Sequence, residues 1–141
     1  MKSSPFKEIG LSALRILIAD DHAAVRRGVR SLLASRSDWE VCGEAVDGLD
    51  AIEKAKSFRP DVVILDISMP KMSGLEAVPL IKKELPNSEI LILSQHDPDH
   101  ARSLALGAGA HGFVAKPDMA RDLLSAIDEL VPNHPSNGTR P

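Results

Sequence analysis

The chain contains four short runs of apolar residues, and a polar or charged side chain follows each of them. The runs cover residues 16–19, 62–65, 90–93 and 112–115, and the residues that follow are Asp20-Asp21, Asp66, Ser94 and Lys116. Short apolar runs are typical of buried strands, and parallel strands bring their carboxyl ends to one edge of a sheet. Because ligands bind at that edge in open α/β sheets, we expect these side chains to meet in one site.

Amphipathic stretches between the apolar runs predict helices. We expect a further strand at residues 40–45 and helices over 22–34, 49–57, 73–85, 98–106 and 118–130. Ser73 and Glu76 have the spacing of a capping box, and Asp97 and Asp118 stand where N-caps are expected. The alternation of strands and helices predicts an α/β domain with a doubly wound parallel sheet.

Composition narrows the class of protein. The chain has 141 residues, of which 43% are hydrophobic and 26% charged, with a net charge of -3. These values suit one globular domain with no general attraction to nucleic acid or anionic lipid. The single cysteine, Cys42, excludes an internal disulfide and fits a reducing compartment. We find no signal peptide or membrane span, and we interpret residues 1–13 as a leader, 14–131 as the domain and 132–141 as a flexible tail or truncated linker.

The predicted site contains the parts that phosphoryl transfer needs. Asp20, Asp21 and Asp66 would place three carboxylates together, and two like charges about 4 Å apart repel by roughly 4 kcal/mol at an effective dielectric near 20. A hard cation relieves that cost, and Mg²⁺ is the ion that suits oxygen ligands and a phosphate. A carboxylate beside Mg²⁺ can attack phosphorus, while Lys116 and Ser94 supply a positive charge and a hydroxyl for the transferred group.

These residues resemble the signature of receiver domains in bacterial two-component response regulators. The likeness is carried by Asp20-Asp21, Asp66 with Met69-Pro70 and Gly74, Ser94, and Lys116-Pro117, and it covers about residues 15–130. The stretches 18–22 and 107–116 further resemble the LuxR/NarL-type subfamily, which usually carries a C-terminal helix-turn-helix. The resemblance implies the three-layer, CheY-like form of the flavodoxin-like fold, with five strands in the order 2-1-3-4-5.

The resemblance also implies roles for residues around the metal. Asp66 would be the phosphoacceptor, Asp21 would bind Mg²⁺ directly, and Asp20 would act mostly through water. The Ser68 carbonyl would be the third protein ligand of the ion. In the family, the positions of Ser68 and His96 flank the phosphoryl group and tune how fast it is lost.

Other implied roles concern the switch that follows phosphorylation. Lys116 would contact the phosphoryl group, Ser94 would be the switch hydroxyl, and Phe113 matches the aromatic residue that moves inward. The Lys116–Pro117 peptide bond is a candidate for the cis form. The implied partners are a sensor histidine kinase and a homodimer mate or output domain. We expect a cytoplasmic signalling protein, not an enzyme, that binds neither nucleic acid nor a membrane directly.

Two other classes of protein remain alternatives. A phosphohydrolase with an aspartyl nucleophile, like the haloacid dehalogenases, often needs a second carboxylate two residues after the nucleophile, where this chain has Ser68. A flavodoxin-like cofactor binder would have to bring a flavin phosphate to three carboxylates that repel it. Asp20 and Asp21 could also merely cap the first helix.

Three other sequence patterns first suggest a binding site, but each has a simpler structural interpretation. The glycines of residues 107–112 follow a helix and open a strand, the reverse of a dinucleotide fingerprint, so they are expected to end the helix. His96 and His100 are four residues apart, but Pro98 places His96 before the helix, which disfavours a metal pair. The arginines of the first helix are interpreted as a solvated face, with a partner surface as the second interpretation: Arg26, Arg27, Arg30 and Arg36.

Overall fold

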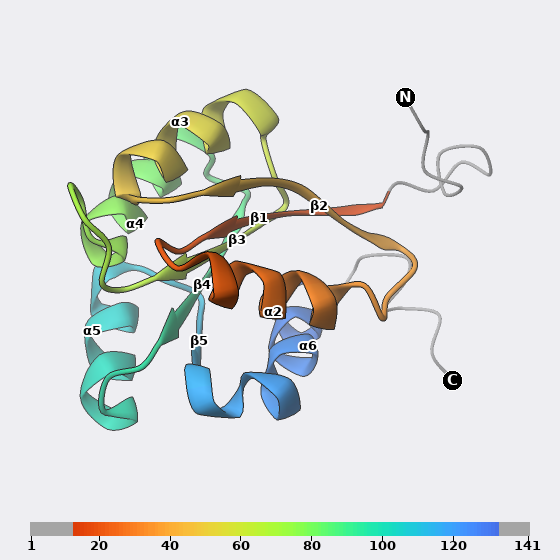
Figure 1. Cartoon of the computed structure of the whole chain (residues 1–141). Coiled ribbons are helices and arrows are strands. Elements are labelled where there is room, and N and C mark those ends of the chain that lie inside the picture. Colours follow the sequence, from red (N-terminus) through yellow and green to blue (C-terminus); the bar gives the residue numbers. More distant parts are fainter. Residues whose placement is uncertain (1–12, 133–141) are drawn as a thin grey trace.

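The computed structural model describes residues 13–132, which form one α/β sheet structure (Figure 1). The predicted leader and tail lie outside the described residues, apart from Ala13 and Pro132. No helix within this range is long and apolar enough to cross a membrane. In chain order the elements are β1 (Leu14–Ala19), α2 (Ala23–Leu33), β2 (Trp39–Ala45), α3 (Gly48–Phe58), β3 (Val62–Asp66), α4 (Gly74–Glu84), β4 (Glu89–Ser94), α5 (Pro98–Ala108), β5 (Gly112–Ala115), the 3-10 helix η1 (Lys116–Asp118) and α6 (Met119–Leu130).

The sheet has the predicted topology. Its five strands are all parallel and lie in the order β2-β1-β3-β4-β5. Helices cover both faces, with α2 and α6 on one side and α3, α4 and α5 on the other (Figure 1). This arrangement is the doubly wound sheet that right-handed crossovers produce from alternating strands and helices.

The core consists of two apolar layers, one on each face of the sheet. In β1, Ile16 and Ile18 pack towards α2 and α6, whereas Leu17 packs towards α3, α4 and α5. The central strand β3 is buried along its whole length. Strands covered on both faces need apolar residues at every position, which explains the continuous runs in the sequence. Each fully buried leucine or isoleucine contributes about 1.5–3 kcal/mol to folding.

Helix ends follow the sequence signals only in part. Ser73 and Glu76 form the predicted capping box of α4, and Gly109 closes α5 with a left-handed φ of 106°. Asp97 and Asp118 occupy the predicted N-cap positions, but neither side chain makes a capping hydrogen bond. Asp118 has φ -102° and ψ 4° at the end of η1, outside the extended conformation that lets a cap side chain reach back to the helix.

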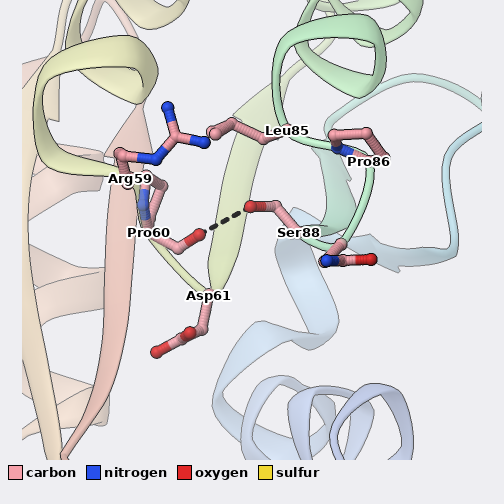
Figure 2. A pocket seen from close by; sticks show the side chains of 7 residues that line it. Arg59, Pro60, Asp61, Leu85, Pro86 and Ser88 are labelled. Carbon is pink, nitrogen blue, oxygen red and sulfur yellow. Dashed lines mark hydrogen bonds between the residues drawn. The ribbon is translucent and has the colours of Figure 1, made fainter.

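The amino edge of the sheet is closed by a contact between two loops. Ser88 is buried, and its hydroxyl donates a 2.6 Å hydrogen bond to the carbonyl of Pro60 (Figure 2). A pocket of about 200 Å³ lies around this contact and includes Arg59 and Asp61. Because Asp61 precedes β3 and Asp66 ends it, the pocket lies at the opposite edge from the predicted site.

Candidate functional site

The four strand ends meet at the carboxyl edge of the sheet, as predicted. The register pairs Ala19 with Leu65, Asp66 with Leu93, and Ser94 with Ala115. Asp20 and Lys116 directly follow the paired ends of β1 and β5. The sequence therefore brings an aspartate, a second aspartate, a serine and a lysine from four strands to one place.

Lys116 stands between the two buried aspartates of this edge. Its Nζ atom lies 2.9 Å from Asp20 Oδ2 and 3.2 Å from Asp66 Oδ1. Asp20 is only 2% exposed and Asp66 only 4%. One cation thus serves two carboxylates that are removed from water, and the pair of aspartates keeps an excess of negative charge.

The electrostatics of the cluster shift two pKa values. Burial raises the pKa of Asp66, and the negative charge of Asp20 raises it further against the opposing charge of Lys116. Burial acts to lower the pKa of Lys116, but its hydrogen bond with Asp20 and the charge of Asp66 outweigh burial and raise that pKa. Lys116 is therefore charged at neutral pH, whereas the ionised form of Asp66 is held at an energetic cost.

The carboxylates converge in a way that fits a divalent cation. Asp20, Asp21 and Asp66 each offer one oxygen, and with a ring nitrogen of His22 these atoms lie within 4.8 Å of one another. Three carboxylate oxygens suit a hard ion such as Mg²⁺, which would offset the charge that Lys116 alone leaves over. His22 was not predicted as part of this site; its Nδ1 atom lies 3.2 Å from Asp21 Oδ1, and its imidazole is exposed.

Two hydrogen bonds of His96 lie at the mouth of the site, and one of them links the two loops there. The backbone N–H of His96 donates to Ser94 Oγ at 3.0 Å, and Ser94 is completely buried. The His96 ring is hydrogen-bonded through Nε2 to the exposed Ser68 Oγ at 2.7 Å. His96 thus joins the loop after β3 to the loop after β4, and it does so before α5 begins, as the sequence predicted.

Phe113 of β5 is buried in this structure. It is 6% exposed, and the Arg102 guanidinium lies 4.9 Å from the centroid of its ring. No peptide bond among residues 13–132 is cis, so the Lys116–Pro117 bond, named above as a candidate for the cis form, is trans in this structure. The trans form is the one that X–Pro bonds favour, by about 0.5–1 kcal/mol, unless the fold demands otherwise.

The interpretation of the first helix as a solvated basic face also holds only in part. Arg27 and Arg30 are exposed, but the Arg26 side chain is 16% exposed and lies beside the acidic cluster. Arg36 forms a two-pronged hydrogen bond with Asp128. The sequence signal for the Arg26 contact was Glu44, a charged residue in a largely apolar strand, because such a residue needs a cationic partner.

The fold and this arrangement define a class of protein. Residues 16–128 match the response regulator receiver domain family, and the chain belongs to that family. Among curated relatives, it is 38% identical over 120 residues to the response regulator protein VraR of Staphylococcus saprophyticus, covering 85% of this chain and 57% of that protein. The chain therefore spans about half the length of the curated relatives it matches.

Solved structures agree with this assignment. The response regulator domain of Thermotoga maritima CheB has a TM-score of 0.79 and 34% identity, over 87% of this chain and 99% of that one. The signal receiver domain of the putative response regulator NarL from Mycobacterium tuberculosis gives 0.79 and 33%, over 86% and 98%. The predicted family, its LuxR/NarL-type likeness and the CheY-like fold are confirmed, and the phosphohydrolase alternative is wrong.

Proposed function

We propose that Asp66 accepts a phosphoryl group from a sensor histidine kinase, with Mg²⁺ held by Asp20, Asp21, Asp66 and the Ser68 carbonyl. The observation that carries this proposal is the position of Lys116 Nζ, 2.9 Å from Asp20 and 3.2 Å from Asp66. It sets a fixed positive charge beside a buried nucleophile, where the transferred group would carry its negative charge. Membership of the receiver family supports the same assignment.

The transfer forms one bond and breaks another. A carboxylate oxygen of Asp66 attacks the phosphorus of a phosphohistidine, and the phosphorus–nitrogen bond breaks. The imidazole leaves with the electron pair and takes up a proton, while Asp66 becomes an acyl phosphate. Acetyl phosphate would serve in the same way, with acetate as the leaving group. Bound Mg²⁺ would neutralise charge on the phosphoryl oxygens. Attack by water later restores the carboxylate and releases phosphate.

The new phosphoryl group changes the contacts of the strand ends. It adds a charge of about -1.5 to -2 near neutral pH. Lys116 exchanges part of its contact with Asp66 for the phosphoryl oxygens, and the Ser94 hydroxyl turns from the His96 amide to donate to them. Movement of Phe113 then links the site to the face of α5, β5 and α6, shifting an equilibrium whose gap is a few kcal/mol.

That face offers a surface for the next step in signalling. Leu106 of α5 is a large apolar residue that is 50% exposed, and it lies one helical turn after Arg102, which contacts Phe113 of β5. We assign this face to a second copy of the chain or to an output domain, and we place the protein in the cytoplasm. The chain would catalyse only its own phosphorylation and dephosphorylation, and it would contact neither nucleic acid nor a membrane directly.

Phosphorylation with a small donor tests the proposal. Wild type, Asp66→Asn and Asp99→Asn would be incubated with acetyl phosphate and Mg²⁺, and intact mass would report the added phosphoryl group. Asp99 is an exposed aspartate of α5 and serves as the matched control. We expect wild type and Asp99→Asn to be labelled and Asp66→Asn to stay unlabelled, with no label on any protein when EDTA replaces Mg²⁺. Equal labelling of all three proteins would overturn the assignment.

The His96 contact supports a role in the lifetime of the phosphoryl group. Its bond to Ser68 lies across the mouth of the site, where an attacking water would enter. We therefore expect His96→Ala to lose phosphate faster than wild type once the donor is removed. His100→Ala, which changes an exposed imidazole of α5, is the control and should keep the wild-type rate.

A further inference from the structure

A partly buried arginine, Arg26, connects Asp20 at the end of β1 to β2, a strand at the edge of the sheet. Arg26 lies in the first turn of α2, and its Nε atom donates to Glu44 Oε1 of β2 at 2.7 Å. Its Nη1 atom donates to the backbone carbonyl of Asp20, also at 2.7 Å. The side chain is only 16% exposed. One planar guanidinium thus joins a side chain of β2 to the backbone between Asp20 and Asp21.

The backbone of Asp20 is consequently fixed from both sides. Its N–H donates to the carbonyl of Ala45 at 3.0 Å, while its carbonyl accepts from Arg26. The direction of that carbonyl sets the plane of the peptide bond between Asp20 and Asp21. The orientation of this peptide plane affects how the two carboxylates project from the strand end.

Glu44 is itself held in place as an anion. Its other carboxylate oxygen accepts from Arg30, at 2.8 Å from Nε, and its backbone carbonyl accepts from Lys54 of α3 at 2.6 Å. Burial acts to raise the pKa of Glu44, but the hydrogen bonds from Arg30 and Arg26 outweigh it and lower that pKa. The Arg26 guanidinium is therefore held between the Glu44 carboxylate and the backbone carbonyl of Asp20.

We propose that Arg26, anchored by Glu44, is a positioning residue that orients the Asp20–Asp21 peptide for Mg²⁺ binding. The inference rests on the proposed function, because it assigns the metal to these carboxylates. Arg26 touches neither the ion nor the phosphoryl group. The two acceptors need two different nitrogens of one rigid fork, which a lysine ammonium on a flexible stem cannot reproduce.

Metal affinity measured without phosphorylation tests the proposal. Mg²⁺ titrations by calorimetry would compare wild type, Arg26→Ala, Arg26→Lys and Arg30→Ala. Removal of residues that orient metal ligands typically costs 10- to 100-fold in affinity, so we expect both Arg26 variants to bind Mg²⁺ about tenfold more weakly. Arg30→Ala removes a hydrogen bond to the same glutamate but none to Asp20, and should stay within about twofold of wild type.

Amide hydrogen exchange supplies a readout that does not depend on the metal. In Arg26→Ala the amides of Asp20 and His22 should exchange faster than in Arg30→Ala, and urea unfolding would check that both variants are folded. If Arg26→Ala does not fold, the comparison rests on Arg26→Lys. Affinities and exchange rates equal to those of Arg30→Ala would overturn this inference alone. A wild type that neither binds Mg²⁺ nor becomes phosphorylated on Asp66 would instead overturn the proposed function.

Discussion

Replacement of Asp66 by asparagine should make the metal-free protein more stable, although it removes an ion pair. At an effective dielectric near 20, Lys116 at 3.2 Å attracts ionised Asp66 by about 5 kcal/mol. Repulsion from Asp20, whose oxygen lies within 4.8 Å, cancels about 3.5 kcal/mol of that attraction. Desolvation of a buried carboxylate costs several kcal/mol more. We therefore expect Asp66→Asn to gain about 1–2 kcal/mol at pH 7.

Magnesium should reverse this order of stability. An ion that binds only the folded state adds about 2.7 kcal/mol when its concentration is 100 times its dissociation constant. Wild type should gain that amount, whereas Asp66→Asn, which has lost one carboxylate, should gain much less. Urea unfolding with and without Mg²⁺ measures both effects, with Asp99→Asn as the control. The reasoning is refuted if Asp66→Asn is the less stable protein without Mg²⁺, or if both proteins gain equally from the ion.

The pH dependence of the same comparison has a defined sign. The folded pKa of Asp66 is raised above its unfolded value near 3.8, so the folded state binds this proton more tightly than the unfolded state does. Ionisation of Asp66 therefore costs stability as pH rises from the unfolded pKa through the folded one. The advantage of Asp66→Asn over wild type should grow as pH rises from 4 to neutral and should disappear as pH falls towards 4. An advantage that stays constant over this range would contradict the burial argument.

Three further substitutions test the packing around the sheet. Gly74→Ala should lose about 2–3 kcal/mol in urea unfolding, because a Cβ there would lie 2.0 Å from the carbonyl oxygen of Asp66. Gly107→Ala is its control and should gain about 0.5–1 kcal/mol, since the Cβ meets nothing within 4 Å inside helix α5. His111→Ala should lose about 1–2 kcal/mol, because the buried amide of Ile90 donates to His111 Nδ1 at 2.9 Å and would lose its acceptor. An unchanged unfolding midpoint in Gly74→Ala or His111→Ala would contradict the prediction for that variant. A midpoint below that of wild type would contradict the prediction for Gly107→Ala.

The sequence predicts the fold and the strand ends well because both depend on short-range patterns. Continuous apolar runs fix the buried strands, and the residue that follows each run must lie at the carboxyl edge whatever the details of packing are. Asp66, Ser94 and Lys116 could therefore be placed together before their contacts were known. The capping box at Ser73 was predictable for the same reason, since both partners lie within one helical turn.

Features that depend on distant partners could not be predicted in this way. Arg26 looks like one of several surface arginines until β2 brings Glu44 against it, 18 residues further along the chain. The hydrogen bond between Ser68 and His96 spans 28 residues and joins two loops. Asp118 lies next to a proline in a tight turn, and the backbone conformation of that turn, not its residue type, prevents side-chain capping. In each case the tertiary structure decides which of several possible contacts forms, and the sequence alone does not distinguish them.

The imbalance of charge at the strand ends connects stability to the proposed function. Lys116 is bonded to Asp20 and to Asp66, so moving it towards a phosphoryl group would ordinarily leave a buried carboxylate unpaired, at a cost of several kcal/mol. A divalent ion held by the same aspartates would remove that cost, since it supplies the positive charge that Lys116 gives up. If the proposed function holds, burial of Asp66 has two expected consequences: it should destabilise the metal-free protein, and it should make the movement of Lys116 depend on the metal. This explains why phosphorylation should require Mg²⁺ even though a lysine already lies beside the nucleophile.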